Sequence, residues 1–232
     1  MKHFKILKSF VIVFYLVLTY ISPLQSLHAS MSAGYSEYFV PGREEDLRKA
    51  FYALKGSGSH RHPIDLSRNH SIISVTAITN NTTIYWDHWE NGYNFDPNNP
   101  STADVTVTIN KGETHKFESP SIPTSPRGTG TYYDSGDRFF TSGGPVSVAR
   151  ASWSQSISHG NPILGLAWAV YPVGALDTHH LIPVGTNSGF SDFRSTTVLI
   201  MAVEDNTHVH YHNGGTTRDV SLRMGRDDYA CQ

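Results

Sequence analysis

Short runs in which apolar and polar residues alternate fill the chain after residue 60, and clusters of Gly, Asn, Asp and Pro separate them. The runs are rich in Val, Ile, Thr, Tyr and Trp, which suit the pleated surface of a sheet. They predict strands near residues 72–79, 82–86, 105–109, 138–141, 146–153, 164–171, 196–203, 208–211 and 220–222. We therefore expect an all-β fold, an antiparallel β-sandwich, with a barrel as the alternative arrangement.

One helix is expected before these strands, over residues 43–54. Its apolar positions recur three to four residues apart, as on one face of a helix: Leu47, Ala50, Phe51 and Leu54. A Gly- and Ser-rich stretch at 55–59 ends it. The pattern thus divides the chain after residue 29 into a helical lead-in, residues 30–60, and a β-sandwich domain, residues 61–232.

An internal repeat runs through the β-rich part. Residues 77–84 parallel residues 202–209, and residues 107–112 are echoed by residues 220–225. Each copy predicts a β-hairpin with a polar two-residue turn, followed by a further strand and a glycine turn. The first copy continues into a Pro-Val-x-Val strand at 145–148, whereas the second copy ends before an equivalent. This predicts an incomplete second repeat with an exposed sheet edge, and a chain that is the leading part of a longer protein.

The N-terminus has the charged, apolar, polar order of a secretory signal peptide. Three lysines, at positions 2, 5 and 8, precede an apolar run from Phe10 to Ile21. This run is shorter than the roughly 20 residues that a membrane-spanning helix needs. We expect residues 1–29 to be removed after Ala29, with cleavage near Ala33 as a second option. An uncleaved membrane anchor and a buried core helix are the other interpretations.

The net charge narrows the classes of binding partner, and the cysteine content indicates what stabilises the fold. The net charge is −2 and no basic run occurs, which disfavours nucleic acid. The single cysteine, Cys231, excludes an internal disulfide, so stability comes from packing and hydrogen bonds. No stretch after the N-terminal run is apolar enough to cross a membrane. We expect a secreted protein, extracellular or at the cell surface, that contacts an extracellular protein or a glycan.

Two acidic loops carry the first candidate site. One contains Asp87, His88 and Glu90 directly after a predicted strand, and the other contains Asp134 and Asp137. If the fold brings the loops together, their oxygens suit Ca²⁺, which takes six to eight such ligands. Alternatively, short acidic side chains in Gly- and Asn-rich turns accept hydrogen bonds from backbone N–H groups.

The same carboxylates also suggest a second function class, an extracellular carbohydrate-active or metal-dependent hydrolase. Glycoside hydrolysis uses a pair of carboxyl groups, and Trp86, Trp89 and Tyr93 suit contact with a sugar ring. No residue pattern selects two of the four carboxylates, however, and the chain has no Gly-x-Ser-x-Gly nucleophile motif. Arg150 lies within an apolar strand, where we expect it to pair with one of these carboxylates.

Three histidines alternate along one predicted strand: His208, His210 and His212. They point to one face of the sheet, and three imidazoles on one face can ligate zinc or copper. The first copy of the repeat has Thr83, Tyr85 and Asp87 at these positions. This comparison favours a solvated polar face over a metal site.

The hairpins and the Pro-Val-x-Val strand, together with four motifs, resemble the N-terminal domain of IgGFc-binding proteins and its bacterial secreted relatives. The motifs are Trp-Asp-His-Trp-Glu-Asn-Gly-Tyr at 86–93, Tyr-Tyr-Asp-Ser-Gly-Asp-Arg at 132–138, Arg-Ala-Ser-Trp at 150–153 and Ile-Pro-Val-Gly at 182–185. The resemblance covers residues 35 to 225. It implies an extracellular β domain of a large surface or mucus-associated protein, without enzymatic activity. It does not imply immunoglobulin binding, because no residue here carries that binding.

The leading hypothesis is therefore a secreted, non-catalytic binding or adhesion domain of a surface or extracellular matrix-type protein. No catalytic residue and no obligatory cofactor are assigned, and Ca²⁺ is the one ion kept as a candidate.

Overall fold

The computed structural model of the protein describes residues 34–54, 64–124, 126–156, 165–181, 197–213, 216–225 and 227–231. The predicted signal peptide at 1–29 and the motif at 182–185 lie outside these residues. Among the described residues, no helix combines the length and the apolar character that a membrane span requires.

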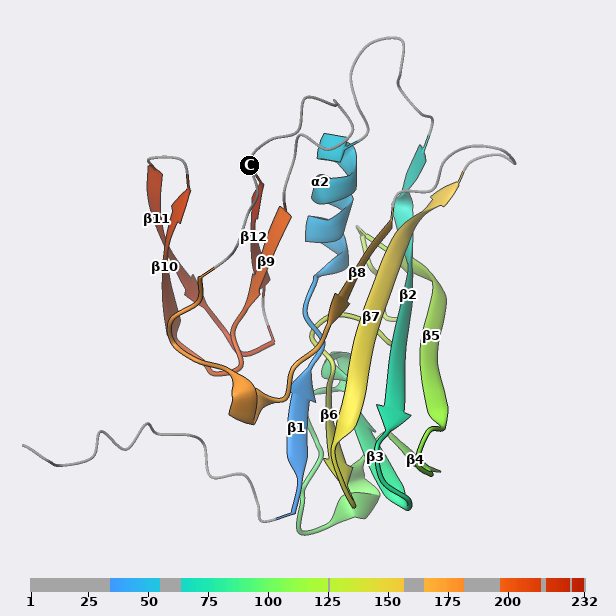
Figure 1. Cartoon of the computed structure of the whole chain (residues 1–232). Helices are drawn as coiled ribbons and strands as arrows, with labels where there is room; N and C mark the ends of the chain where they lie inside the picture. The colour runs from blue at the N-terminus through green and yellow to red at the C-terminus, as the bar shows by residue number, and fades with distance from the viewer. Residues whose placement is uncertain are drawn as a thin grey trace, which may run out of the picture. The chain divides into compact units, whose positions relative to one another are not determined.

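The described part is mostly β-strand with one helix, as predicted (Figure 1). The elements in chain order are β1 (Ser36–Phe39), α2 (Glu44–Leu54), β2 (Ile64–Ala77), β3 (Thr82–Asp87), β4 (Val105–Ile109), β5 (Thr114–Pro123), β6 (Arg138–Ser142), β7 (Val146–Ser156), β8 (Gly165–Ala169), β9 (Thr197–Met201), β10 (Thr207–Asn213), β11 (Thr216–Leu222) and β12 (Asp227–Cys231). Short 3₁₀ turns lie at Trp89–Asn91, Pro100–Thr102 and Val173–Ala175.

Three strands were not predicted: β1, β5 and β12. Their sequences are short or polar, and β5 contains Pro120 and ends at Pro123. Proline is tolerated at edge positions of a sheet, and β5 is an edge strand that pairs with β2 alone. The prolines in β5 therefore kept the sequence pattern from predicting this strand, and its pairing with β2 is what makes it a strand.

Two four-stranded antiparallel sheets form the sandwich. Their strand orders are β1-β6-β3-β4 and β5-β2-β7-β8. Strands β9 to β12 form two further antiparallel pairs, β12-β9 and β10-β11. The all-β, sandwich-like prediction is thus confirmed.

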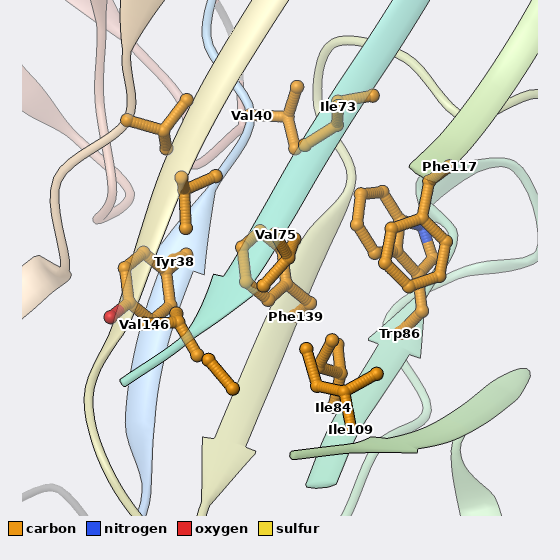
Figure 2. Close-up of a cluster of buried hydrophobic side chains, with 13 residues drawn as sticks. Tyr38, Val40, Ile73, Val75, Ile84, Trp86, Ile109, Phe117, Phe139 and Val146 are labelled. Atoms are coloured by element: carbon orange, nitrogen blue, oxygen red, sulfur yellow. The ribbon is translucent and has the colours of Figure 1, made fainter. Parts of the chain in front are cut away.

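The core is built from the alternate positions of strands in both four-stranded sheets (Figure 2). Ile73 and Val75 of β2 and Ile84 and Trp86 of β3 are completely buried. The Trp86 ring stacks on Phe117 of β5 at 4.2 Å and on Phe139 of β6 at 5.0 Å between ring centroids. Since aromatic side chains bury a large area, this stack is a principal source of the packing energy.

The Asn80-Asn81 turn does not close the predicted hairpin. Strand β2 pairs with β5 and β7, whereas β3 pairs with β4 and β6 in the other sheet. Strands β9 and β10, on either side of the second copy's turn, likewise belong to different pairs. The apolar sides of β2 and β3 both contribute to one core, so the two strands lie in facing layers. Each turn therefore crosses between sheets, and the hairpin prediction is wrong at both places.

Candidate functional site

The two acidic loops meet at one end of the β3–β6 pair. Asp87 ends β3 and lies opposite Arg138, the first residue of β6, in the antiparallel register. The loop after β3 therefore lies beside the loop before β6, which contains Asp134 and Asp137. The structure brings together the side chains that the sequence left as separate candidates.

Asp137 is the centre of this cluster and is completely buried. Its carboxylate accepts hydrogen bonds from Trp86 Nε1–H at 2.8 Å, from the Trp89 backbone N–H at 3.1 Å and from His88 Nδ1 at 3.0 Å. The Asp134 backbone N–H approaches it at 3.4 Å. Such a set of donors is typical of a carboxylate that organises a loop.

Asp87 is held in a similar way. Its two oxygens accept hydrogen bonds from Arg138 Nε at 2.7 Å and from the backbone N–H groups of Asn94 at 3.0 Å and Phe95 at 3.2 Å. Asp87 is completely buried. This carboxylate therefore fixes the loop that follows β3.

Glu90 and Asp134 share the guanidinium group of Arg127. Arg127 Nη2 donates to Glu90 at 2.6 Å and also to Asp134. Asp134 accepts a further bond from Trp89 Nε1–H at 3.2 Å, and Glu90 accepts one from the Tyr132 backbone N–H at 3.1 Å. Arg127 was not singled out in the sequence, although it stands in the same loop as Asp134. Only the fold shows that it is the cation between the two acidic loops.

Arg150 does not pair with any of these four carboxylates, which corrects the prediction. It is completely buried, its Nη2 donates to Glu44 in the first turn of α2, and its Nη1 donates to the backbone oxygens of Pro41 and Gly42. The guanidinium also lies 5.4 Å from the centre of the Trp168 ring. Arg150 therefore fastens the start of α2 to β7, a contact between segments far apart in the sequence.

Burial and crowding of negative charge shift the pKa values of the cluster. Burial raises the pKa of Asp137 to about 6, against the lowering effect of its hydrogen bond to His88 and of the His88 charge. Burial also raises the pKa of Asp134 well above its usual range, and the charges of Glu44 and Asp137 add to this. These carboxyls thus hold their protons to a higher pH than solvated ones do.

His88 has a raised pKa as well. Burial of the ring lowers its pKa, but the hydrogen bond to Asp137 and the negative charges of Asp137, Glu90 and Asp104 outweigh burial. Because Nδ1 faces Asp137, the Nε2 edge of the ring lies on the opposite side. Asp137 therefore fixes the orientation of this histidine.

His88 also lines a hollow of about 480 Å³. The other lining residues come from β5 and from the loop before β6: Glu118, Ser119, Pro120, Ser121, Thr131, Tyr132 and Tyr133. Tyr133 packs inward against Trp86, Phe117 and His88, whereas Thr131 and Glu118 are exposed. The lining of the hollow thus combines aromatic rings, hydroxyl groups, a carboxylate and the His88 imidazole, which Asp137 holds in one orientation.

The aromatic residues predicted to contact a sugar do not line this hollow. Trp86 is completely buried in the core. Trp89 has the Arg127 guanidinium over its ring at 4.7 Å, and Tyr93 has that of Arg138 at 4.5 Å. The Tyr93 hydroxyl also donates to the Gly136 backbone oxygen. Tyr132 and Tyr133, quoted in the sequence only as part of a motif, are the tyrosines at the hollow.

Most of the oxygens expected to ligate Ca²⁺ are engaged in other contacts, whereas Glu90 Oε2 is buried without a hydrogen-bond partner among the described residues. Asp87, Asp134 and Asp137 accept N–H bonds with both oxygens or share a guanidinium group, as the capping alternative anticipated. Within the described residues, His88, Glu90 and Asp137 have ligand atoms within 4.8 Å of one another. A His88 nitrogen also bonds Asp137 and a Glu90 oxygen also bonds Arg127, so these three residues take part in an ionic network.

The three histidines of β10 lie on one exposed face, as predicted. Each contacts its neighbour on β11: His208 bonds Ser221 at 3.0 Å, His212 bonds Thr217 at 3.3 Å, and His210 pairs with Asp219. These contacts run across the strand pair and fit a solvated polar face.

Comparison of the chain with models of protein families, with curated proteins and with solved structures finds no match. The resemblance to the N-terminal domain of IgGFc-binding proteins therefore stays a prediction from its motifs. Two of the motifs, at 86–93 and 132–138, supply most of the ionic cluster described above.

Proposed function

We propose that the protein is a secreted, non-catalytic binding domain of a surface or extracellular matrix-type protein, and that the hollow beside His88 binds a glycan. The observation that carries the proposal is the hollow itself, which presents Tyr132, His88 and Glu118 around one volume. The secretory pattern of residues 1–29 and the family resemblance support an extracellular setting.

The chemistry of the hollow suits a saccharide. Sugars combine apolar C–H faces, which pack on aromatic rings, with hydroxyl groups that donate and accept hydrogen bonds. Tyr132 supplies a ring, while Glu118, Ser121 and His88 supply acceptors and donors. An extracellular carbohydrate is thus the ligand class that this lining favours.

The size of the hollow favours a glycan over a protein surface. Its volume of about 480 Å³ lies within the roughly 300–1,000 Å³ typical of small-ligand sites. A stable protein partner would instead need about 800 Å² of contact on each side. The hollow is therefore better matched to one or two sugar units.

The arrangement of the carboxylates supports binding rather than hydrolysis. A glycosidase needs two carboxyl groups that reach the glycosidic oxygen and the anomeric carbon. Asp87, Asp134 and Asp137 are completely buried and bonded to arginines or N–H groups. Asp137 and Glu90 act on the hollow indirectly, because Asp137 orients His88 and Glu90 accepts a hydrogen bond from the Tyr132 backbone N–H.

The test is a glycan array probed with the purified secreted chain, followed by calorimetry on the ligands found. Tyr132→Ala and Glu118→Ala are each expected to weaken binding about tenfold, the equivalent of ~1.4 kcal/mol. Tyr171→Ala is the matched control, because Tyr171 is 66% exposed and does not line the hollow.

Three results would contradict the proposal. A blank array removes the glycan ligand, and binding that Tyr132→Ala leaves unchanged moves the site elsewhere. Release of shortened glycan during prolonged incubation, detected by mass spectrometry, shows hydrolysis and replaces the binding function with the enzymatic one.

A further inference from the structure

Two groups of four strands share one topology: the first strand group, β2 to β5, and the second strand group, β9 to β12. In each group the outer strands pair with each other and the inner strands pair with each other. The registers also correspond. Thr76 lies opposite Thr114 as Met201 lies opposite Asp227, and Thr82 lies opposite Ile109 as Thr207 lies opposite Leu222.

The crossing turns of the two groups are held by the same hydrogen bonds. Gly112 N–H donates to Ala77 O at 2.9 Å, and Gly225 N–H donates to Ala202 O at 2.9 Å. A side-chain oxygen accepts the next bond in each group: Asn80 from Lys111 N–H and Asp205 from Met224 N–H, both at 3.1 Å.

The backbone agrees in the same detail. Asn81 and Asn206 are the non-glycine residues of the described chain with positive φ, at 55° and 58°. The hydroxyl of the following threonine donates back to the turn in both groups, from Thr82 at 3.1 Å and from Thr207 at 2.8 Å. Such agreement in register, caps and dihedral angles supports two copies of one structural unit.

The first group has two strands that the described part of the second group lacks. Strand β7 pairs with the other edge of β2, from Val146 opposite Ala77 onward, and β6 pairs with the other edge of β3. Among the described residues, β9 pairs with β12 alone and β10 with β11 alone. Unpaired edges present N–H and C=O groups that can accept a further strand.

Side-chain exposure follows this difference. Thr82, Ile84 and Trp86 of β3 are completely buried, and β6 lies beside them. Their counterparts on β10, Thr207, Val209 and Tyr211, are only half-buried. The apolar face that β6 and β7 help to cover in the first group is thus partly uncovered in the second.

The link between β6 and β7 also packs against the crossing turn of the first group, residues 78–81. Gly143 lies so close that a Cβ atom there would be 2.5 Å from the Asn81 backbone oxygen, and its own oxygen accepts a bond from Thr79 Oγ1 at 3.1 Å. Thr79 is half-buried there, whereas its counterpart Glu204 in the second group is exposed.

We propose that the free edges of β9 and β10 bind a partner segment of two strands joined by a short glycine-proline turn. The segment lies where β7 and β6 lie against β2 and β3, with alternate apolar side chains facing Val209. It is added as strands to two existing pairs, so main-chain hydrogen bonds carry the affinity and alternate side chains carry the specificity. The surface does not include the hollow beside His88, and this inference is independent of the proposed function.

The histidines of β10 favour a negative charge on the partner segment. Asp87 of β3 lies opposite Arg138 of β6 and pairs with it, and His212 occupies the place of Asp87 on β10. A carboxylate at the place of Arg138 therefore complements the histidine face better than a guanidinium does.

The probe is a synthetic peptide with the sequence of residues 138–153 and the change Arg138→Glu, added to the full secreted chain. Hydrogen exchange measured by mass spectrometry is expected to slow by at least about tenfold in β9 and β10. Strands β2 and β3 are the internal control, because β7 and β6 already cover their edges. A peptide that also carries Val146→Asp and Val148→Asp is the matched control and is expected to give no protection.

Several outcomes would overturn the proposal. Equal protection by the aspartate peptide means non-specific association, and protection of β2 and β3 instead means exchange with β6 and β7. Protection of β9 and β10 that rises with protein concentration in the absence of peptide assigns the edges to a second copy. If neither the Arg138→Glu peptide nor the peptide with Arg138 retained protects β9 and β10, the edges do not accept this segment.

Discussion

At the scale of single residues, the acidic loops are organised by charge pairs that form only when the loops meet. Asp137 collects donors from Trp86, His88 and Trp89, while Arg127 links Glu90 to Asp134. The carboxylates of Glu44, Glu90, Asp134 and Asp137 stand around Arg127, Arg150 and His88, so negative charge is in excess. The raised pKa values of Asp134 and Asp137 follow first from burial and then from this excess.

The pH dependence of stability is expected to follow the Asp137–His88 pair. The folded state holds the Asp137 proton to about pH 6, above the usual value of 3.8, so it binds more protons than the unfolded state in that window. Stability then falls as the pH rises from about 4 to 6, by on the order of 2 kcal/mol. The raised pKa of His88 has the same sign, since its contribution is present below pH ~6.5 and is lost as the pH rises through its folded pKa.

Thermal unfolding of the protein at a series of pH values from 4 to 8 measures this slope. Asp137→Asn is expected to flatten it, and Glu204→Gln, a change at an exposed carboxyl group, is expected to leave it unchanged. Asp134, whose pKa is also raised, adds a slope of the same sign that Asp137→Asn leaves in place. A slope of opposite sign, or one that is as steep in Asp137→Asn as in the unchanged chain, would rule out the pair as a source.

Arg150 is expected to be essential for stability rather than for binding. Arg150→Met leaves Glu44 buried without its closest cation and is expected to cost roughly 3–5 kcal/mol. Adding Glu44→Gln in the same chain should recover part of this loss, because the unpaired charge is then removed. Urea unfolding of the two single variants and the double variant measures the coupling, and strictly additive losses would contradict a direct pair.

At the scale of elements, the crossing turns decide the architecture. The turn at 78–81 sends the chain from one sheet to the other, and the link between β6 and β7 packs on it. The position of Gly143 has two requirements, a φ of 89° and a close approach to the Asn81 backbone oxygen. Glycine meets both because it has no Cβ atom.

A matched pair of glycine substitutions separates these two requirements. Gly143→Ala and Gly112→Ala impose a similar φ strain, since Gly112 has φ 82°, but a Cβ atom at Gly112 meets no atom within 4 Å. Gly143→Ala is therefore expected to be the more destabilising by roughly 1–3 kcal/mol. Chemical unfolding measures both free energies, and equal losses would show that the close approach has no energetic role.

At the scale of the whole molecule, the sandwich supports a hollow at one end of the β3–β6 pair, and the described residues leave one edge of β9 and one edge of β10 unpaired. The core between the sheets fixes Trp86 and Tyr133, which in turn hold His88 at the hollow. The proposed glycan binding and the proposed strand addition thus involve separate surfaces.

Export is a prediction for the whole chain. Expressed with its own N-terminus in a secretory host, the protein is expected in the medium with a new N-terminus at Ser30, because residues 1–29 have the pattern of a signal peptide. N-terminal sequencing and intact mass measure the processing site. Replacing apolar residues of the 10–21 run with charged ones is the control that should retain the protein in the cell, and secretion unaffected by that change would contradict the prediction.

The sequence by itself determined the strand-rich class, the helix α2 and the candidate carboxylates, because these depend on local alternation, helical spacing and turn residues. It did not decide which sheet each strand joins. The Asn80-Asn81 turn fits a hairpin locally, and only the shared core of β2 and β3 places them in facing layers. Nor did it decide the ion pairs. Arg150 pairs with Glu44 and Arg127 with Glu90 across long stretches of chain, because burying a charge requires whichever opposite charge the fold brings near. Local patterns thus specify elements, and burial selects their partners.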